Sequence, residues 1–555
     1  MHTNEKFPLG QLLLESNIIT QSQLDQALKK QAETGDLLGL TLIKMGFVDE
    51  ETVFLPILAS QLGVDFVKVK NLSITSETIA KIPARFASFY KILPVDYRDE
   101  VLTVATNTPF NIDIIDGINV VLPCRIHTVL ASEKDIHEGI RQYYGVGADT
   151  IDQMMGDVNV EHAGGGVENI EEIDSEASIG KFINQILLEA YKDRATDIHI
   201  EPFEKDLKVR YRVDGVLQDA QVPANIWHFK DSINSRIKIM ANLNIAEKRL
   251  PQDGRFKVRV GEVDLDLRVS FLPTEYGESV VIRILSSSKL YSMEDLGLKG
   301  KNLQVLERLI QKPHGIIFVT GPTGSGKTTT LYTCLSRVNT ADKKIITIED
   351  PVEYQLKGVT QVQINPQIGL TFAKGLRSML RHDPDIMMVG EVRDFETAEI
   401  AIQVALTGHL VFSTLHTNDA ASGVTRLIDM GVDPYLVSSS VECFVAQRLV
   451  RRICPQCKVP ANITPDIIED FGLTPAQYEG ITIYESKGCE ACNSTGFYGR
   501  EGIYEFLVMT DEIREMVTSR ASSAQIKKKA IEQGMKTLLE SGWDKIVKGV
   551  TSASE

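Results

Sequence analysis

The run best suited to chemistry is Gly321-Pro-Thr-Gly-Ser-Gly-Lys-Thr328, which lies directly after an apolar strand and directly before a helical pattern. Small residues in such a loop let backbone N–H groups close around the phosphates of a nucleotide. Lys327 can then reach the β- and γ-phosphate oxygens, and the Thr328 hydroxyl can ligate Mg²⁺. The predicted ATP contacts are Gly321, Pro322, Thr323, Gly324, Ser325, Gly326, Lys327, Thr328 and Thr329.

A second apolar run, PDIMMVG, ends just before Glu391. A carboxylate at the end of a strand beside the phosphate-binding loop can orient the attacking water and its metal, and we expect Glu391 to do so. Gly390 stands where many enzymes with this loop have a metal-binding aspartate. The sequence therefore leaves open whether Glu391 contacts the metal directly or through a water. An acid in an exposed loop is the alternative.

A third run, KKIITIEDPVEY, places Glu349, Asp350 and Glu353 close together, and His409 and His416 bracket a fourth run, GHLVFSTLHTND. Three acids at one strand end repel one another unless a cation is near, and Mg²⁺ with ATP supplies one. The two histidines could sense the γ-phosphate or bind the neighbouring loop. A solvated acidic turn and two structural histidines are the alternatives.

Two Cys-x-x-Cys pairs, Cys454 with Cys457 and Cys489 with Cys492, lie about thirty residues apart. Four soft ligands in two turns suit tetrahedral Zn²⁺, and in a reducing cytoplasm this spacing indicates a metal before a disulfide. Because no other polar group is obliged to approach the metal, we assign the predicted zinc site to structure and not to catalysis.

The length and composition indicate a globular protein of several domains. A chain of 555 residues is too long for one hydrophobic core. Its content of 43% apolar and 24% charged residues is that of an ordinary globular protein. A net charge of −16 argues against a nucleic-acid partner. No run reaches the roughly 18 apolar residues of a membrane span, and the amino terminus lacks the pattern of a signal peptide, so we expect a cytoplasmic location.

Changes of pattern divide the chain into residues 1–143, 144–178, 179–288 and 289–555. The first segment predicts a docking domain, with a near-repeat of two helical hairpins over 1–60 and an α+β unit over 65–143. The second, rich in glycine and acids, predicts a flexible linker. The third predicts another α+β domain, and the fourth an α/β ATPase domain with the cysteine pairs in an insertion at about 450–500.

These motifs, in this order and spacing, resemble those of the secretion ATPases of type II secretion and type IV pilus assembly. The glycine-rich run is similar to the family's Walker A motif, IEDPVEY to its Asp box, DPDIMMVGEVRDFETAEIA to its Walker B motif and TGHLVFSTLHTND to its His box. The resemblance covers the chain from about residue 179 and includes DIHIEP, RYRVDGVL, EKRLPQDGR and the cysteine pairs. It implies a RecA-like P-loop core of the α/β class, a preceding α+β domain, a helical and α+β amino-terminal domain and a small four-cysteine metal insertion.

The resemblance also implies partners and further site residues. Members of the family form hexamers whose ATP-driven domain motions turn an inner-membrane platform, so peripheral association with the inner membrane is expected. By the same comparison, Arg268 in LDLRVS and Arg283 in VVIRIL should reach the nucleotide, and Arg377 and Arg381 in GLRSMLRHDPD are further candidates for phosphate contact. Such arginines offset charge that develops in phosphoryl transfer, and for each one a surface salt bridge is the alternative.

Several functions fit the sequence. A type II secretion ATPase is the leading interpretation, since TIEDPVEY and LVSSSVECFVAQRLVRRICPQC are closer to that branch, and a type IV pilus assembly ATPase is the near alternative. A nucleic-acid translocase is disfavoured by the acidic balance. A regulatory module that binds ATP without hydrolysing it is disfavoured by Glu391 and the Asp box.

The amino-terminal near-repeat resembles cyclic di-GMP binding domains found at the start of some of these ATPases. The residues that fit the motif are Gly10, Gly39, Gly46, Gln23 and Leu24. Pro8 and Leu37 stand in place of the two motif arginines, however, and Asn17 replaces the first downstream glycine. Each lost charge-assisted contact removes roughly 1.5 to 3 kcal/mol of binding free energy. We therefore predict a protein-docking module with weak or no cyclic di-GMP binding.

Overall fold

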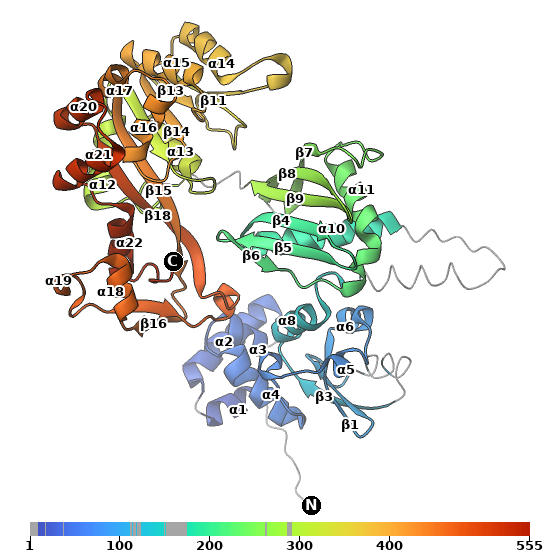
Figure 1. Ribbon diagram of the computed structural model, residues 1–555. Coiled ribbons are helices and arrows are strands. Elements are labelled where there is room, and N and C mark those ends of the chain that lie inside the picture. The colour runs from blue at the N-terminus through green and yellow to red at the C-terminus, as the bar shows by residue number, and fades with distance from the viewer. Residues whose placement is uncertain are drawn as a thin grey trace, which may run out of the picture. The chain divides into compact units, whose positions relative to one another are not determined.

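The computed structural model in Figure 1 describes residues 9–16, 18–36, 38–111, 114, 118, 124–148, 150, 175–260, 263–285 and 291–555. The chain forms two compact units. Unit 1 consists of Met1–Gly261 and Leu267–Ile284, and unit 2 of Glu262–Asp266 and Leu285–Glu555.

The near-repeat at the start of unit 1 folds as small helical hairpins. Its helices are α1 Leu9–Glu15, α2 Gln21–Thr34, α3 Leu38–Lys44, the π-helical turn Glu50–Phe54 and α4 Leu55–Leu62. Thr20 and Asp49, at matching places in the two copies, each accept a hydrogen bond from the backbone three residues on and so cap a helix. Leu13 and Leu42, which the repeat pairs, are buried in one apolar cluster. The two copies therefore pack on one another.

A three-stranded sheet follows, made of β1 Ile92–Arg98, β2 Val101–Thr106 and β3 Arg125–Leu130. β1 and β2 are antiparallel, whereas β2 and β3 are parallel. The surrounding helices are α5 Ser76–Ile79, α6 Ala84–Tyr90 and α8 Glu133–Tyr144. These elements form the α+β unit that the sequence predicts.

The segment predicted as a linker is packed at its beginning and helical at its end. The Val146 N–H donates to the Gln221 carbonyl at 2.7 Å, and a Cβ on Gly147 would lie 2.4 Å from the Phe182 ring. Helix α10 begins at Ser175, inside the predicted segment. Residues 151–174 lie outside the described part of the chain. The predicted linker is therefore too long at both ends. Val146 and Gly147 at its beginning are packed against other residues of unit 1, and from Ser175 onward its end belongs to helix α10.

The second α+β domain has a six-stranded sheet in the order β6-β5-β4-β9-β8-β7. The strands are β4 Ala195–Pro202, β5 Leu207–Val213, β6 Val216–Asp219, β7 Gln252–Val260, β8 Val263–Thr274 and β9 Gly277–Leu285. Helix α10 (Ser175–Lys192) packs on β4 and on α11 (Lys230–Met240). Residues on β5 and β8 alternate between buried and more exposed positions, as half-covered strands do.

Unit 2 is built on a seven-stranded sheet in the order β12-β11-β13-β14-β10-β15-β18, in which only β18 is antiparallel to its neighbour. Its strands are β10 Gly315–Thr320, β11 Ile345–Glu349, β12 Val359–Gln363, β13 Ile386–Val389, β14 Leu410–Leu415, β15 Val441–Ile453 and β18 Phe497–Val508. The central strands are buried along their whole length, which is typical of parallel strands covered on both faces.

Helices cover the two faces of this sheet. Ile316 and Phe318 of β10 belong to one apolar cluster, and the intervening Ile317 and Val319 belong to the other. The helices are α12 Gly300–Ile310, α13 Lys327–Val338, α14 Phe372–Met379, α15 Phe395–Leu406, α16 Ala421–Asp429, α17 Pro434–Ser440, α20 Asp511–Thr518, α21 Ser523–Glu532 and α22 Leu538–Val547. Strand order and coverage are those of a RecA-like core.

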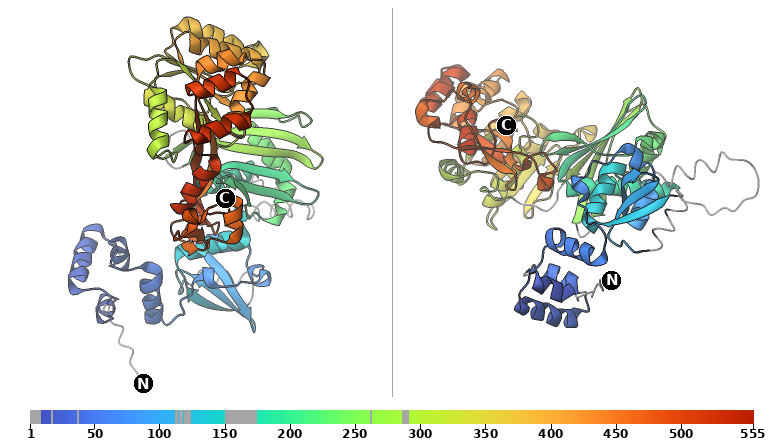
Figure 2. Two further views of the ribbon diagram at one scale, coloured as in Figure 1. Left: turned by 60° about the vertical axis from the view of Figure 1, so that its left-hand side comes forward. Right: turned by 90° about the horizontal axis from the view of Figure 1, so that it is seen from below.

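The elements between β15 and β18 form a module at the far end of this long ribbon in Figure 1, and the left view of Figure 2 shows it from another side. The cysteine pairs belong to this module. Its elements are β16 Lys458–Ala461, α18 Pro465–Phe471, α19 Pro475–Tyr478, β17 Ile483–Ser486 and the 3₁₀ turn Glu490–Cys492. Ile483 packs with Trp543 and Ile546 of α22 in a small core. The module therefore shares apolar contacts with the last helix of the chain.

Candidate active site and metal centre

The glycine-rich loop joins β10 directly to α13, and its glycines are required by its shape. Gly321, Gly324 and Gly326 have φ of 148°, 80° and 84°. A Cβ on Gly321 would lie 2.6 Å from the Gln447 carbonyl oxygen and from Ser325 Oγ. The loop is thus tightly curved around its own backbone at the amino terminus of a twelve-residue helix, the position where backbone N–H groups favour an anion.

Lys327, the first residue of α13, is buried and turns back over the loop. Its Nζ donates to the carbonyl oxygens of Gly321 at 2.8 Å and Pro322 at 3.0 Å. Burial lowers the pKa of Lys327, and the nearby Glu391 carboxylate partly offsets this effect. The side chain is therefore a desolvated positive charge beside the loop.

Two hydroxyl groups at this loop are buried without a protein partner. Ser325 Oγ and Thr320 Oγ1 make no hydrogen bond within the part of the chain that the structure describes. Because a buried hydroxyl without a partner costs free energy, these atoms favour a polar ligand at the loop. The tight glycine curve, the buried lysine and the two hydroxyls together fit a nucleotide phosphate with its cation.

Glu391 lies beside the loop because of strand register. β10 pairs with β14 from Gly315–Leu410 to Thr320–Leu415, and β13 pairs with β14 from Ile386–Leu410 onward. The residues that follow these three parallel strands therefore emerge at one edge of the sheet. Lys327, Glu391 and His416 all follow strands at this carboxyl edge.

The Glu391 carboxylate is held by two neighbours. His416 Nε2 lies 3.2 Å from Glu391 Oε2, and an Arg393 guanidinium nitrogen lies 2.5 Å from Glu391 Oε1. Glu391 itself is buried, whereas both partners are substantially exposed. The arrangement fixes the orientation of a carboxylate next to the phosphate-binding loop.

The three acids of the third run take different positions. Glu349, the last residue of β11, is buried and accepts hydrogen bonds from the Tyr332 hydroxyl, from Thr347 Oγ1 at 2.5 Å and from Gln361 Nε2 at 3.2 Å. Burial raises the pKa of Glu349, and these hydrogen bonds oppose the rise. Asp350 is exposed, and the Glu353 backbone N–H donates to the Tyr332 hydroxyl at 3.3 Å. The Glu349 side chain thus ties β11 to α13, the helix that begins at the phosphate-binding loop.

His409 does not lie with the other predicted residues. It precedes β14, its Nδ1 lies 3.1 Å from the Val404 carbonyl oxygen, and its own carbonyl accepts from the Gly315 N–H. This is the amino edge of the sheet, about 20 Å from the carboxyl edge at roughly 3.3 Å per residue. The prediction of a catalytic role for His409 is therefore corrected, since two histidines that bracket one strand lie at opposite edges.

Arg377, Arg381 and Arg283 contact acids or backbone groups in the described structure. An Arg377 guanidinium nitrogen lies 2.7 Å from Glu396 Oε1, and Arg381 donates to the Arg377 carbonyl at 3.0 Å. In unit 1, Arg283 Nε donates to Asp197 Oδ1 at 2.8 Å, and Arg268 lies on β8. A nucleotide contact of any of the four stays a prediction.

Residues of β15 complete the surroundings of the loop, and the sequence analysis missed them. Ala446 pairs with Thr320, so Gln447 and Arg448 extend past the end of β10. Gln447 Oε1 accepts from Thr330 Oγ1 at 2.8 Å, and Arg448 donates to Asn418 Oδ1 at 3.0 Å. Their only sequence signal is their place at the end of a long apolar run, which does not reveal that β15 lies next to β10.

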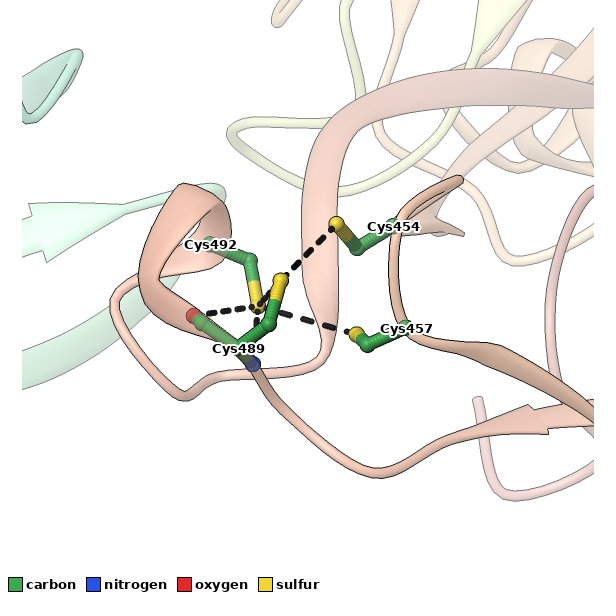
Figure 3. A group of neighbouring side chains, drawn as sticks. All are labelled: Cys454, Cys457, Cys489 and Cys492. Carbon is green, nitrogen blue, oxygen red and sulfur yellow. Dashed lines mark hydrogen bonds between the residues drawn. The ribbon is translucent and has the colours of Figure 1, made fainter. Parts of the chain in front are cut away.

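The four cysteine sulfurs form one cluster, shown in Figure 3. All four Sγ atoms lie within 4.8 Å of one another, with 3.7 Å from Cys454 to Cys489, 3.7 Å from Cys489 to Cys492 and 3.9 Å from Cys457 to Cys492. Tetrahedral zinc with bonds of about 2.3 Å separates its sulfurs by about 3.8 Å. The donor set and its spacing therefore fit Zn²⁺.

Backbone N–H groups support this cluster. The N–H groups of Cys489 and Gly496 both donate to Cys492 Sγ at 3.2 Å. Burial alone would raise the pKa of Cys492, but these hydrogen bonds lower it to about 7. Such donors stabilise the thiolate form that metal binding requires.

None of the helices in the described residues combines the length and the apolar character needed to cross a membrane. The residues Pro8, Asn17 and Leu37, on which the cyclic di-GMP prediction depends, lie outside the described part of the chain.

The seven-stranded sheet and the helices on its two faces define a RecA-like core, the fold of a class of ATPases. The family described as Type II/IV secretion system protein matches residues 172–555, and the MshEN domain matches residues 62–150. The chain belongs to the Type II/IV secretion system protein family, and it is an ATPase of the secretion and pilus-assembly class.

Two relatives extend over nearly the whole chain. The Type IV pilus assembly ATPase PilB of Myxococcus xanthus is 44% identical over 99% of this chain and 98% of its own length. The Type II secretion system protein E of Xanthomonas campestris pv. campestris is 44% identical over 98% of this chain and 96% of its own length. Among solved structures, the Legionella pneumophila ATPase DotB shares the fold with a TM-score of 0.50 at 21% identity, covering 67% of this chain and 93% of that one.

Proposed function

We propose that this chain hydrolyses ATP with Mg²⁺ at the carboxyl edge of the unit 2 sheet. The observation that carries the proposal is the convergence of Lys327, Glu391 and His416 beyond three neighbouring parallel strands. Lys327 supplies a buried positive charge to the terminal phosphates, and the backbone of residues 321–329 encloses them. Bound Mg²⁺ would neutralise charge on the phosphates, and Thr328 would hold it through its hydroxyl.

Glu391 orients the attacking water in this proposal. Its carboxylate is held at one oxygen by Arg393 and at the other by His416. A carboxylate fixed in this way loses little conformational freedom when it accepts a hydrogen bond from the water. His416 is thus a positioning residue for Glu391. Glu349, Asp350 and Glu353 contribute negative charge at the end of β11, with Glu349 acting through Tyr332 of α13.

The cysteine cluster is proposed as a resident Zn²⁺ site with Cys454, Cys457, Cys489 and Cys492 as ligands. The support is the sulfur spacing and the N–H groups that donate to Cys492. Bound metal would join the turn after β15 to the turn before β18 and so close the module.

We further propose a homo-hexamer in which Arg268 and Arg283 contribute positive charge to the nucleotide. The motor acts on an inner-membrane platform as a peripheral component and drives pseudopilus assembly for type II secretion. Pilus assembly is the second candidate, and it is supported by the PilB relative, whose identity to this chain equals that of the type II secretion relative. Deleting the gene in the source organism distinguishes the two candidates. Loss of exported proteins supports type II secretion, and loss of surface pili with normal export supports pilus assembly.

The hydrolysis proposal is tested on the purified full chain. We expect phosphate release from ATP in the presence of Mg²⁺ and none when EDTA removes the metal. Nucleotide binding without phosphate release under both conditions would contradict the proposal and support a regulatory module.

A further inference from the structure

The loop that follows His416, residues 417–420, is anchored to the carboxy-terminal helices by a partly buried charge cluster. Lys527 Nζ on α21 lies 3.0 Å from Asp419 Oδ2 and 3.8 Å from Glu505 Oε2 on β18. Glu505 is only 1% exposed. One lysine therefore holds two acids that come from different elements of unit 2.

Both acids in turn hold the backbone of this loop and its surroundings. Asp419 Oδ1 accepts from the Ser422 N–H at 2.8 Å, and Glu505 Oε1 accepts from the Ala420 N–H at 2.9 Å. The second oxygen of Glu505 accepts from the Leu538 N–H, at the first residue of α22, at 3.3 Å. The cluster thus links the loop to α21, to the start of α22 and to β18.

The anchored loop is the one that carries His416 toward Glu391. Thr417 Oγ1 donates to the Asp419 carbonyl at 3.0 Å, and His416 lies 3.2 Å from the Glu391 carboxylate. On its other side the loop is held by Arg448, which donates to Asn418. A displacement of Asp419 therefore shifts a segment only three residues from His416.

We infer that Lys527 is a positioning residue for ATP hydrolysis, which sets the place of His416 and Glu391 through Asp419 and Glu505. The inference rests on the proposed role of Glu391. Without Lys527, Asp419 and Glu505 are two carboxylates that share no cation, and one of them is buried. Their repulsion moves the loop, and small displacements at a reacting centre lower kcat by about tenfold to a hundredfold.

The same contacts make α21 a route by which the carboxy-terminal helices affect hydrolysis. Any partner that shifts α21 moves Lys527 relative to Asp419. The nucleotide loop itself does not contact this cluster through any hydrogen bond of the described residues. The change therefore falls on kcat and leaves the affinity for ATP nearly unaltered.

The test measures kcat and KM for Mg²⁺-ATP in the full chain carrying Lys527→Met, with Lys528→Met as the matched control. Lys528 is the next residue on the same helix and is exposed. We expect Lys527→Met to lower kcat at least about tenfold with KM within about twofold, and Lys528→Met to match the wild type. Lys527→Arg should recover most of the loss, because the guanidinium can hold both acids.

Asp419→Asn keeps the acceptor for the Ser422 N–H but removes the charge, so it tests the same link if Lys527→Met does not fold. It should lower kcat similarly, and where Lys527→Met folds, combining the two substitutions should add no further loss. Equal kcat for Lys527→Met and Lys528→Met, or additive losses, would overturn the inference. Glu391→Gln measured in parallel separates the two proposals: if it is active, the role of Glu391 fails, whereas if it is inactive and Lys527→Met is normal, only the link fails.

Discussion

The glycine-rich loop and the cysteine module both contain tight turns with glycines at positive φ, yet they differ in how far protein groups already satisfy the polar atoms of the proposed ligand site. In the module, Gly488, Asn493 and Gly496 have positive φ, and N–H groups already donate to the Cys492 sulfur. In the glycine-rich loop, Lys327 donates to the carbonyl oxygens of Gly321 and Pro322 in the same loop. Ser325 Oγ has no protein partner in the described residues. The cysteine module suits a ligand that stays bound, and we call it the resident site. The glycine-rich loop suits a ligand that is exchanged at every turnover, and we call it the exchanging site.

Removing the charge of the exchanging site should have the largest effect. We expect Lys327→Ala to lower hydrolysis at least about a hundredfold, because the phosphates lose a buried charge partner. The measurement is phosphate release by the purified variant, with Lys343→Ala as control, since Lys343 is an exposed lysine of the same domain. Hydrolysis near the wild-type rate would remove Lys327 from the site.

Breaking the resident site should unfold a module without abolishing the nucleotide loop. We expect Cys454→Ser with Cys457→Ser to lose bound zinc and to lower the temperature of thermal unfolding, because metal binding contributes to local folding. Metal analysis should find about one zinc per chain in the wild type and in Cys124→Ser, whose thiol lies outside the cluster. A wild-type chain purified without zinc would contradict this account.

The two histidines offer a finer comparison, between the nucleotide site and the opposite edge of the same sheet. We expect His416→Asn to lower kcat by about tenfold, since Glu391 loses one of its two holders, and His409→Asn to change it less than about twofold. Both variants should bind nucleotide, which a fluorescent ATP analogue would show. A larger loss of kcat in His409→Asn than in His416→Asn would show that the amino edge of the sheet, where His409 lies, takes part in hydrolysis.

The smallest effect is expected from cyclic di-GMP. Pro8 and Leu37 stand where the binding motif has arginines, so calorimetry on the full chain should detect weak or no binding. Submicromolar affinity would show that other donors replace the arginines and would make this messenger a candidate trigger of the motor.

The sequence predicts these regions to different depths. Walker A and the cysteine pairs lie within short stretches whose spacing carries the chemistry, so residues such as Gly321, Lys327 and Cys454 could be chosen without a fold. The pairing of His416 with Glu391, and the separation of His409 from both, depend on which strands are neighbours and on their direction. That information is long-range, and apolar runs of five or six residues do not contain it.

Residues that act from another strand or helix were missed for the same reason. Arg448 and Gln447 reach the loop only because β15 lies beside β10, and Lys527 reaches Asp419 only because α21 packs near α16. The packed start of the predicted linker was also missed, because Val146 and Gly147 belong to a glycine-rich stretch whose composition is typical of a flexible segment.

The central claim, that the carboxylate at the end of β13 turns over the nucleotide held by the loop, is tested most directly by Glu391→Gln. The amide has nearly the same shape but cannot orient the water as a carboxylate does. We expect this variant to bind ATP with an affinity close to that of the wild type and to hydrolyse it at least about a hundredfold more slowly. Hydrolysis at the wild-type rate, or a loss of nucleotide binding, would contradict the account.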